Sequence, residues 1–402
     1  MILPRSTSRR LATLVTLLAL AACGGNDGDP TGSGGTTAGS GGGGSGGMAA
    51  GGAAEGGAGG EDPCVPFSAS LDAKLVETND AVVGPGGTVA AVWTPACGLW
   101  TGAAGEREIG VAMKPSDILR VGSITKTYVA AAFVQLAEDG MLSLDDPLSS
   151  FVTTGLPNED SITLHQLLNH SAGVFNYTED SAFVNAAVAN PTKIYEPQEI
   201  VDVAIDHGPD FEPGASWHYS NTGYILLGMV LEAVTGQGAG EHLRGAMLAP
   251  QGLEHTFLDG EETAPEPIAK GYGPNGVDWT NILPPSVPWT AGSMAANTED
   301  LVTWARALYQ GDAISPGARA AMLTFTPVSN NTYGLGVVRG TLPTGQEVMG
   351  HGGAIPGYTA SLYYLPNEDI ALATIVNSSA RDSEEAFLAL AEVVVSQAPS
   401  AP

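Results

Sequence analysis

The stretch that decides the fold is Ser123-Ile124-Thr125-Lys126, followed by the uncharged run 127–137, TYVAAAFVQLA. A helix that is apolar nearly all round is a buried helix, and residues three apart lie on one face of it. Burial disfavours the charged form of a lysine, and the positive end of the helix dipole acts the same way, so both lower its pKa. The stretch therefore predicts a neutral Lys126 that takes the proton of Ser123 and makes it a nucleophile. The alternative is a surface lysine that follows a helix cap.

Strands are expected before this helix and again near the C-terminus, with helices between them. Residue composition and flanking turn residues indicate strands at 88–93, 99–102, 118–121, 334–338, 347–349, 359–365 and 370–377, with a hairpin turn at 366–369. Helices are expected at 71–77, at 123–139 before Gly140, at 224–234 before Gly236, and from about Asp382 to Ser396, with Glu385 placed for a capping box.

This order of elements predicts an α+β fold. Strands and helices open the folded part, a mainly helical region fills about 144–288, and strands with a helix close it. The simplest assembly is one mostly antiparallel sheet flanked by helices, built from both ends of the chain, with the helical region inserted. We expect this domain to span residues 63–398.

A second motif, Tyr219-Ser220-Asn221, lies just before an apolar helix. A phenol near Ser123 and Lys126 could pass a proton to a leaving group, and an asparagine could hold a substrate amide by hydrogen bonds. Read alone, the motif is better explained as a tyrosine and an asparagine that cap the next helix.

A third motif, Gly350-His351-Gly352-Gly353-Ala354, follows one expected strand and precedes another. Glycines let a substrate approach the backbone closely, and a histidine there could support the tyrosine electrostatically or relay protons. Read alone, the motif is a glycine-rich turn with a bystander histidine.

Ser123-x-x-Lys126, Tyr219-x-Asn221 and His351-x-Gly353, in this order, resemble the family of class C β-lactamases, secreted serine DD-carboxypeptidases and related esterases. The similarity spans about residues 86–379. The flanking segments fit too: 120–123 (RVGS), 167–173 (LLNHSAG) and 211–214 (FEPG). The histidine of the third motif resembles the carboxypeptidase and esterase branches more than the lactamases, which typically have lysine there.

The resemblance implies a β-lactamase/transpeptidase-like fold and a role for each motif residue. Ser123 is the acylated nucleophile, Lys126 and Tyr219 share the general-base and general-acid work, Asn221 holds the acyl-side amide, and His351 assists the proton relay. The backbone N–H groups of Ser123 and Ala354 form the oxyanion hole, beside the substrate-binding Gly352 and Gly353.

Two departures from the family pattern concern substrate choice. The peptidases usually have a hydroxyl residue, which helps to bind the terminal carboxylate, where this chain has Gly352. The best alignment puts Val338 where they place an arginine, and Arg339 follows one residue later, so it faces the other side of a strand. Both changes favour an ester or a different amide over a free C-terminal carboxylate.

The N-terminus is typical of an exported protein. Arg9 and Arg10 precede an apolar run to Ala22 that is too short to span a bilayer. The run ends in LAAC at Cys23, which resembles a bacterial lipoprotein cleavage box with Cys23 as the lipidated residue; an ordinary secretory signal is the alternative. With a signal at 1–22 and a flexible Gly/Ser-rich linker at 23–62, we expect an extracytoplasmic, lipid-anchored domain at the bacterial cell membrane.

Two further cysteines, Cys64 and Cys97, are expected to form a disulfide in an oxidising compartment, and two buried free thiols are the alternative. The 402-residue chain has a formal net charge of -28, which argues against binding to nucleic acid or to anionic lipid surfaces. His165 and His170 do not have the spacing of a zinc site, so we expect no metal and no cofactor. The GxSxG pattern at 43–47 lies in the linker and is attributed to chance.

These features predict a serine hydrolase that works through an acyl-enzyme. A D-alanyl-D-alanine carboxypeptidase-like activity on cell-wall peptides is the first hypothesis, and a β-lactamase or carboxylesterase of the same fold is the alternative. A rival of another class is a penicillin-binding receptor lipoprotein that is acylated once and does not turn over. We expect a monomer whose partners are a small-molecule or peptide substrate and the membrane lipid.

Overall fold

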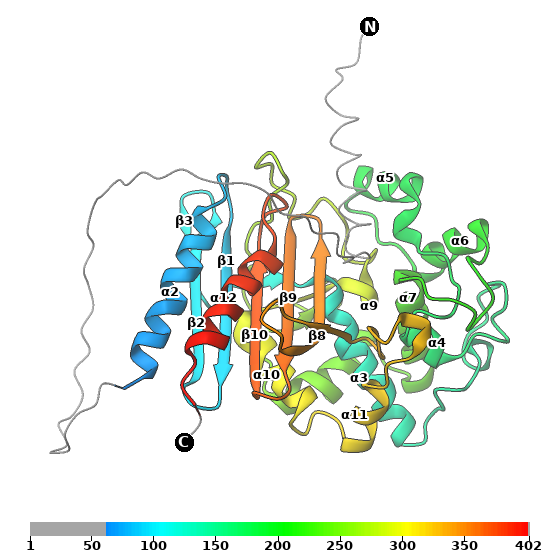
Figure 1. The fold of residues 1–402 in the computed structure, drawn as a ribbon. Helices are drawn as coiled ribbons and strands as arrows, with labels where there is room; N and C mark the ends of the chain where they lie inside the picture. The colour runs from blue at the N-terminus through cyan, green and yellow to red at the C-terminus, as the bar shows by residue number, and fades with distance from the viewer. Residues whose placement is uncertain (1–61, 401–402) are drawn as a thin grey trace, which may run out of the picture.

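The computed structural model describes residues 62–400, and the expected signal peptide, Cys23 and linker lie outside this range. Its centre is an antiparallel seven-stranded sheet with the order β3-β2-β1-β10-β9-β8-β7 (Figure 1). The strands are β1 (Gly87–Thr94), β2 (Gly98–Glu108), β3 (Val111–Ala112), β7 (Val338–Thr341), β8 (Glu347–Ile355), β9 (Tyr358–Leu365) and β10 (Ile370–Val376). Because β1 pairs with β10, both ends of the domain share one sheet, which confirms the predicted α+β architecture.

Two helices cover one face of this sheet, α2 (Cys64–Asp80) and α12 (Ser383–Gln397), which lie side by side (Figure 1). Their apolar side chains, among them Leu71 and Leu390, form a separate hydrophobic core with the sheet. The Asp382 side chain caps α12 by accepting the Glu384 N–H, and among the described residues Glu385 completes no capping box.

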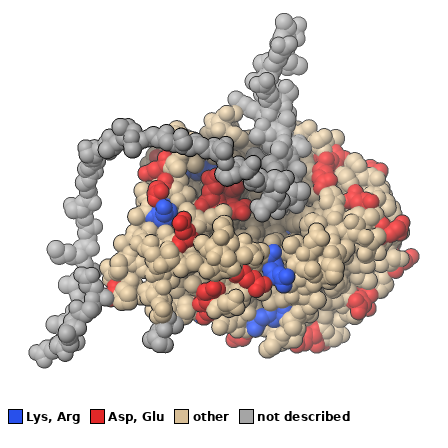
Figure 2. Space-filling model, in the orientation of Figure 1, with Lys and Arg blue, Asp and Glu red and all other residues tan. Residues whose placement is uncertain are grey.

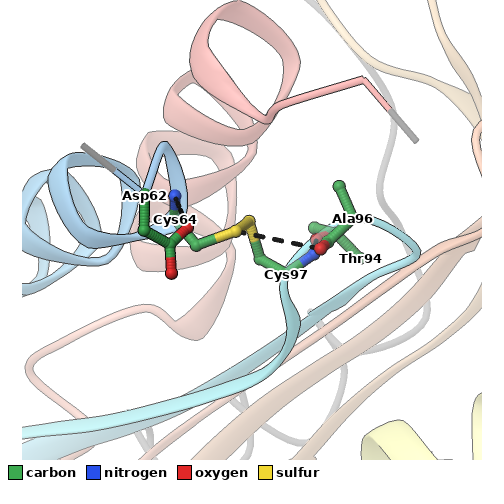
Figure 3. The surroundings of a disulfide bond; sticks show 5 residues. All are labelled: Asp62, Cys64, Thr94, Ala96 and Cys97. Carbon is green, nitrogen blue, oxygen red and sulfur yellow. Dashed lines mark hydrogen bonds between the residues drawn. A yellow bond between two sulfur atoms is a disulfide. The ribbon is translucent and has the colours of Figure 1, made fainter. Parts of the chain in front are cut away.

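A disulfide fastens this outer layer to the sheet (Figure 3). Cys64 lies in the first turn of α2, and Cys97 lies in the turn between β1 and β2. Their sulfur atoms are 2.02 Å apart and close a loop with a sequence separation of 33.

The other face carries the helical region, in which α3 (Thr125–Glu138) is buried along nearly its whole length. The remaining helices are α4 (Leu164–Leu168), α5 (Ser181–Ala189), α6 (Pro197–His207), α7 (Asn221–Thr235), α8 (Ala239–Leu243), α9 (Trp289–Gly292), α10 (Thr298–Tyr309) and α11 (Pro316–Met322). A small sheet joins β4 (Leu119–Arg120), β6 (Met294–Ala296) and β5 (Phe257–Leu258). The helical region therefore extends beyond its predicted end at about residue 288, up to β7.

Three local predictions differ from the structure. Residues 334–337 form a turn rather than a strand, because Gly336 has a positive φ of 66° and packs against α3, where an added Cβ would lie 2.7 Å from the Lys126 carbonyl oxygen. The third motif is part of β8 rather than a turn between strands. The serine helix begins with a 3-10 turn, η1 (Gly122–Ile124), before α3.

The surface is acidic on the face shown in Figure 2, where Asp and Glu are spread among few Lys and Arg. This agrees with the net charge of -28. No helix in residues 62–400 is long and apolar enough to cross a membrane.

Candidate active site

The site is built around the first turn of α3, where Ser123 and Lys126 lie one helical turn apart. The Lys126 Nζ is 3.1 Å from the Ser123 Oγ. The lysine side chain is fully buried, and this desolvation lowers its pKa well below the usual value of 10.5. A buried helix thus holds a weakly basic amine beside a hydroxyl group.

The other partners of Lys126 fix which way its lone pair points. The Nζ donates to the Asn221 Oδ1 at 2.8 Å and to the Ala291 carbonyl oxygen at 2.6 Å. Both oxygens only accept hydrogen bonds. A neutral amine has two N–H groups, so these two bonds use both and leave the lone pair for the Ser123 hydroxyl hydrogen.

Tyr219 is the third member of the cluster. The Lys126 Nζ lies 4.8 Å from the centroid of its ring. Its hydroxyl faces Ser123, yet it is buried without a hydrogen-bond partner among the described residues. Burial raises the pKa of this phenol above its usual value. A buried hydroxyl without a partner calls for an explanation, and a bound substrate would supply one.

Asn221 begins α7 and links the lysine to the cavity wall. Its backbone N–H donates to the Asn176 Oδ1 at 3.1 Å, while its Nδ2 makes only long contacts of 3.4 Å to Asn176 and Thr178. One side of the amide is therefore committed to Lys126, and the other is held weakly enough to turn to a substrate carbonyl.

The third motif reaches the serine through β8. A Cβ on Gly353 would lie 1.9 Å from the Val121 carbonyl oxygen and 3.0 Å from the Ser123 nitrogen, and one on Gly122 would lie 2.7 Å from the Ala354 nitrogen. Only glycine permits this approach. It places the backbone N–H groups of Ser123 and Ala354 close together, as an oxyanion hole requires.

His351 lies near Tyr219 and is hydrogen-bonded to Tyr333. Its ring is 6.2 Å from the Tyr219 ring, and its Nε2 is 2.9 Å from the Tyr333 hydroxyl. Burial, and secondarily the nearby Lys126, lowers the pKa of His351 to about 3. Tyr333 also contacts the Nε2 of His170 at 3.1 Å. Neither His170 nor Tyr333 belongs to the three sequence motifs.

A cavity that is partly open to solvent leads to Ser123. Among the described residues, its wall contains no Asp, Glu, Lys or Arg and is largely apolar. The lining residues are Ser123, Tyr177, Thr178, Val184, Asn221, Leu283, Val287, Pro288, Ala291, Gly292, Ala354 and Ile355. Trp289 and Tyr358 are buried outside this wall, where the Trp289 indole N–H donates to Glu261 and the Tyr358 hydroxyl donates to the Ala269 carbonyl oxygen, so both belong to the core.

In the described part of the chain, the two departures from the family pattern leave the cavity wall without a hydroxyl group at position 352 and without an arginine. Gly352 brings no hydroxyl group, and Arg339 lies 3.8 Å from Glu347 and over the Phe325 ring rather than in the cavity wall. Among residues 62–400, no cluster of three or more His, Cys, Asp or Glu could hold a metal ion.

Residues 76–395 match the sequence model of the family described as Beta-lactamase. A D-stereospecific amidohydrolase from Streptomyces sp. is 35% identical, with coverage of 79% of this chain and 97% of that one and a TM-score of 0.71. The D-amino acid amidase of Ochrobactrum anthropi is 27% identical, with coverage of 82% and 99% and a TM-score of 0.73. Penicillin-binding protein 4* of Bacillus subtilis is 28% identical over 70% of this chain, and the alignment spans 66% of that protein, slightly less than two thirds of its length.

Proposed function

Because the chain belongs to the Beta-lactamase family of serine hydrolases, we propose that it hydrolyses an amide or ester through an acyl-enzyme formed on the Ser123 Oγ. The observation that carries this proposal is the hydrogen bonding of Lys126, which aims the lone pair of a neutral amine at the Ser123 hydroxyl.

The reaction follows from this arrangement. Lys126 takes the Ser123 proton while the Oγ attacks the substrate carbonyl carbon, and the N–H groups of Ser123 and Ala354 stabilise the oxyanion. As the bond to the leaving group breaks, Tyr219 donates a proton to that group and regains one from Lys126. Water then attacks the acyl-enzyme through the same groups, which releases the acid and restores Ser123.

We propose a substrate that carries no free carboxylate at the scissile bond, such as the amide or ester of a D-amino acid derivative. In residues 62–400 the cavity wall has no basic side chain for a carboxylate and offers apolar contacts from Leu283 and Val287. The amidohydrolase and the amidase with similar structures are named for D-stereospecific and D-amino acid substrates, and these names support the stereochemistry proposed here.

A second candidate is D-alanyl-D-alanine carboxypeptidase activity, which the similarity to a penicillin-binding protein favours. Its substrate would present a carboxylate that only backbone N–H groups and neutral side chains of the described cavity could bind. We expect this activity to be weaker than amide or ester hydrolysis.

The test compares the wild type with Ser123→Ala on D- and L-amino acid amides, p-nitrophenyl esters, a D-Ala-D-Ala peptide and a chromogenic cephalosporin. We expect turnover of D-amides and esters, and an intact mass raised by one acyl group when a slow substrate is added. Ser123→Ala should lose at least ~10⁴-fold in kcat and show no adduct. Full activity of that variant would reject the proposal, and a burst of one equivalent without turnover would indicate the receptor instead.

We also propose that Cys23 carries a lipid that holds the domain outside the cytoplasm, although this residue lies outside the described range. The support is the sequence LAAC at its cleavage box. Labelled palmitate should be incorporated into the wild type but not into Cys23→Ser, and equal labelling of both would exclude the anchor.

A further inference from the structure

Three buried side chains form a hydrogen-bonded chain that the proposed reaction does not use. The Tyr333 hydroxyl lies 3.1 Å from the Nε2 of His170 and 2.9 Å from the Nε2 of His351. All three rings are buried next to Tyr219, with centroids 4.2 Å (His170), 6.3 Å (Tyr333) and 6.2 Å (His351) from its ring. This series of hydrogen bonds therefore packs against the catalytic phenol.

The first half of the chain has a fixed direction. The backbone N–H of Ser220 donates to the Nδ1 of His170 at 3.2 Å, and a backbone N–H only donates. The Nδ1 therefore carries no hydrogen. In a neutral imidazole the hydrogen then belongs to the Nε2, which donates it to the Tyr333 oxygen.

The second half is fixed from the other end. The Nδ1 of His351 contacts the carbonyl oxygen of Gly352, which only accepts, so this nitrogen carries the hydrogen. The Nε2 is then an acceptor and receives the hydroxyl hydrogen of Tyr333. The bonds all run one way, from the Ser220 N–H through His170, Tyr333 and His351 to the Gly352 carbonyl.

The neighbouring hydroxyl of Tyr224 does not change this assignment. It lies beside the Tyr333 hydroxyl and donates its own hydrogen to the Leu168 carbonyl oxygen at 2.9 Å. If Tyr333 donated to Tyr224, the hydrogen of His351 would have to move to its Nε2, and two lone pairs would then face each other between its Nδ1 and Gly352. That arrangement is unfavourable in a buried site.

This series of hydrogen bonds does not accommodate a protonated, charged imidazole. Protonation of His351 at its Nε2 would set two N–H donors against one phenol oxygen and leave the Tyr333 hydrogen without its acceptor. The ionisable groups that face the two histidines are Lys126, Tyr219, Tyr224 and His218, and none of them is a carboxylate. Burial lowers the pKa of both histidines, which agrees with the neutral forms.

We propose that His170, Tyr333 and His351 are positioning residues that hold two walls of the site together. His351 neither gains nor passes on a proton during turnover. One end of the chain is Ser220, between Tyr219 and Asn221, and the other is Gly352, two residues before Ala354 on β8. This series of hydrogen bonds thereby sets the distance between the Tyr219 phenol and the oxyanion-hole N–H groups. This role rests on the proposed acyl transfer, whereas the tautomers themselves do not.

The direct test is nitrogen NMR of the full chain labelled with ¹⁵N-histidine, assigned with His170→Asn and His351→Asn. We expect His170 to carry its hydrogen on the Nε2 and His351 on the Nδ1, with neither titrating from pH 5 to 9. A hydrogen on the His351 Nε2, or a titration in this range, would overturn the proposal. If the tautomers are as expected but Ser123→Ala stays active, the proposed function fails and the hydrogen-bonded chain stands.

Kinetics supply the second test. Tyr333→Phe removes the linking hydroxyl and should lower kcat on the order of 10- to 100-fold with little change in KM, because positioning errors of about 1 Å have effects of this size. Tyr128→Phe is the matched control, because its hydroxyl is equally buried but has no hydrogen-bond partner among the described residues. Equal kcat values for the two variants would overturn the proposal.

A further pair of variants separates positioning from proton transfer. His351→Gln retains a neutral acceptor for the Tyr333 hydroxyl, whereas His351→Leu does not. Positioning predicts that the glutamine variant keeps roughly tenfold more of the kcat than the leucine variant. A proton relay through the imidazole would leave both variants equally inactive, which would contradict the proposal.

Discussion

The two faces of the central sheet are built from different kinds of side chain. The face under α2 and α12 is packed with apolar residues and closed by the disulfide Cys64–Cys97. The face under α3 buries an amine, several phenols and two imidazoles, although buried polar groups destabilise a fold unless they are paired. Apolar packing therefore stabilises both faces, and the second face also holds the groups that the proposed reaction uses. Variants of the two faces should therefore change different quantities.

Among the variants that compare the two faces, the largest effect is expected at Lys126. Lys126→Met preserves the length of the buried side chain but removes the base, so kcat should fall by about 10²–10⁴-fold while the folded protein persists. The control is Lys74→Met, in which the replaced amine lies on α2 of the other face and pairs with Glu77. Steady-state kinetics on an ester check both. A kcat that is equal in the two variants would show that the faces do not differ in this way.

On the face under α2 and α12, Leu71→Ala should lower stability without lowering kcat. Leu71 is fully buried between α2 and the sheet, so truncation should lower the free energy of unfolding by about 2–5 kcal/mol and leave kcat unchanged. Val76, 48% exposed on the same helix, provides the matched control as Val76→Ala. Urea unfolding measures the difference. An activity loss at 25 °C that exceeded the loss of folded protein would contradict the separation of the faces.

The disulfide lies on the same face as Leu71, so its removal should also lower stability and leave activity unchanged. Replacing both Cys64 and Cys97 with serine should lower the free energy of unfolding by about 2–4 kcal/mol, because the loop then has more freedom in the unfolded chain. Activity on a small ester should remain. A reducing agent should lower the Tm of the wild type but not that of the double variant, and an equal shift in both would mean that the bond does not stabilise the domain.

The smallest effect is a dependence of stability on pH. Since the folded-state pKa of Lys126 is lowered below 10.5, the unfolded chain binds a proton that the folded protein does not in the range between these two values. Unfolding free energy should therefore rise with pH in this window, by up to about 1.4 kcal/mol per pH unit, and Lys126→Met should lack this contribution. Urea unfolding at pH 7, 8 and 9 tests it. Parallel pH profiles for the wild type and Lys126→Met would show that the amine is charged when folded.

Much of the fold was predictable because its signals are local. Residue composition and flanking turn residues located β1, β9 and β10, and the glycine at position 236, in a left-handed conformation, ended α7 as expected. The misassigned segment 334–337 reads as a strand by composition, but Gly336 fits closely against α3, a long-range contact that no local pattern reveals.

The site shows the same division. Ser123, Lys126, Tyr219 and Asn221 lie in short motifs that the family resemblance identifies, and the structure brings them together. The sequence offered His170 only as part of a flanking segment and as a histidine without zinc-site spacing, and Tyr333 had no signal. The hydrogen bond between them joins segments 163 residues apart in the chain, so only the folded backbone shows that they meet.

The pairing of β1 with β10 has a consequence for how the protein is made. Val89 lies opposite Ile375, so a central pair of the sheet joins the start of the domain to nearly its end. A nascent chain cannot complete this pair until β10 (Ile370–Val376) has been synthesised, and such late, non-local contacts slow folding. A molecule cut short before residue 370 would lack β10 and expose the edge of β1. Until β10 is made, the N-terminal strands β1 to β3 therefore cannot join the C-terminal strands β7 to β9 in one sheet.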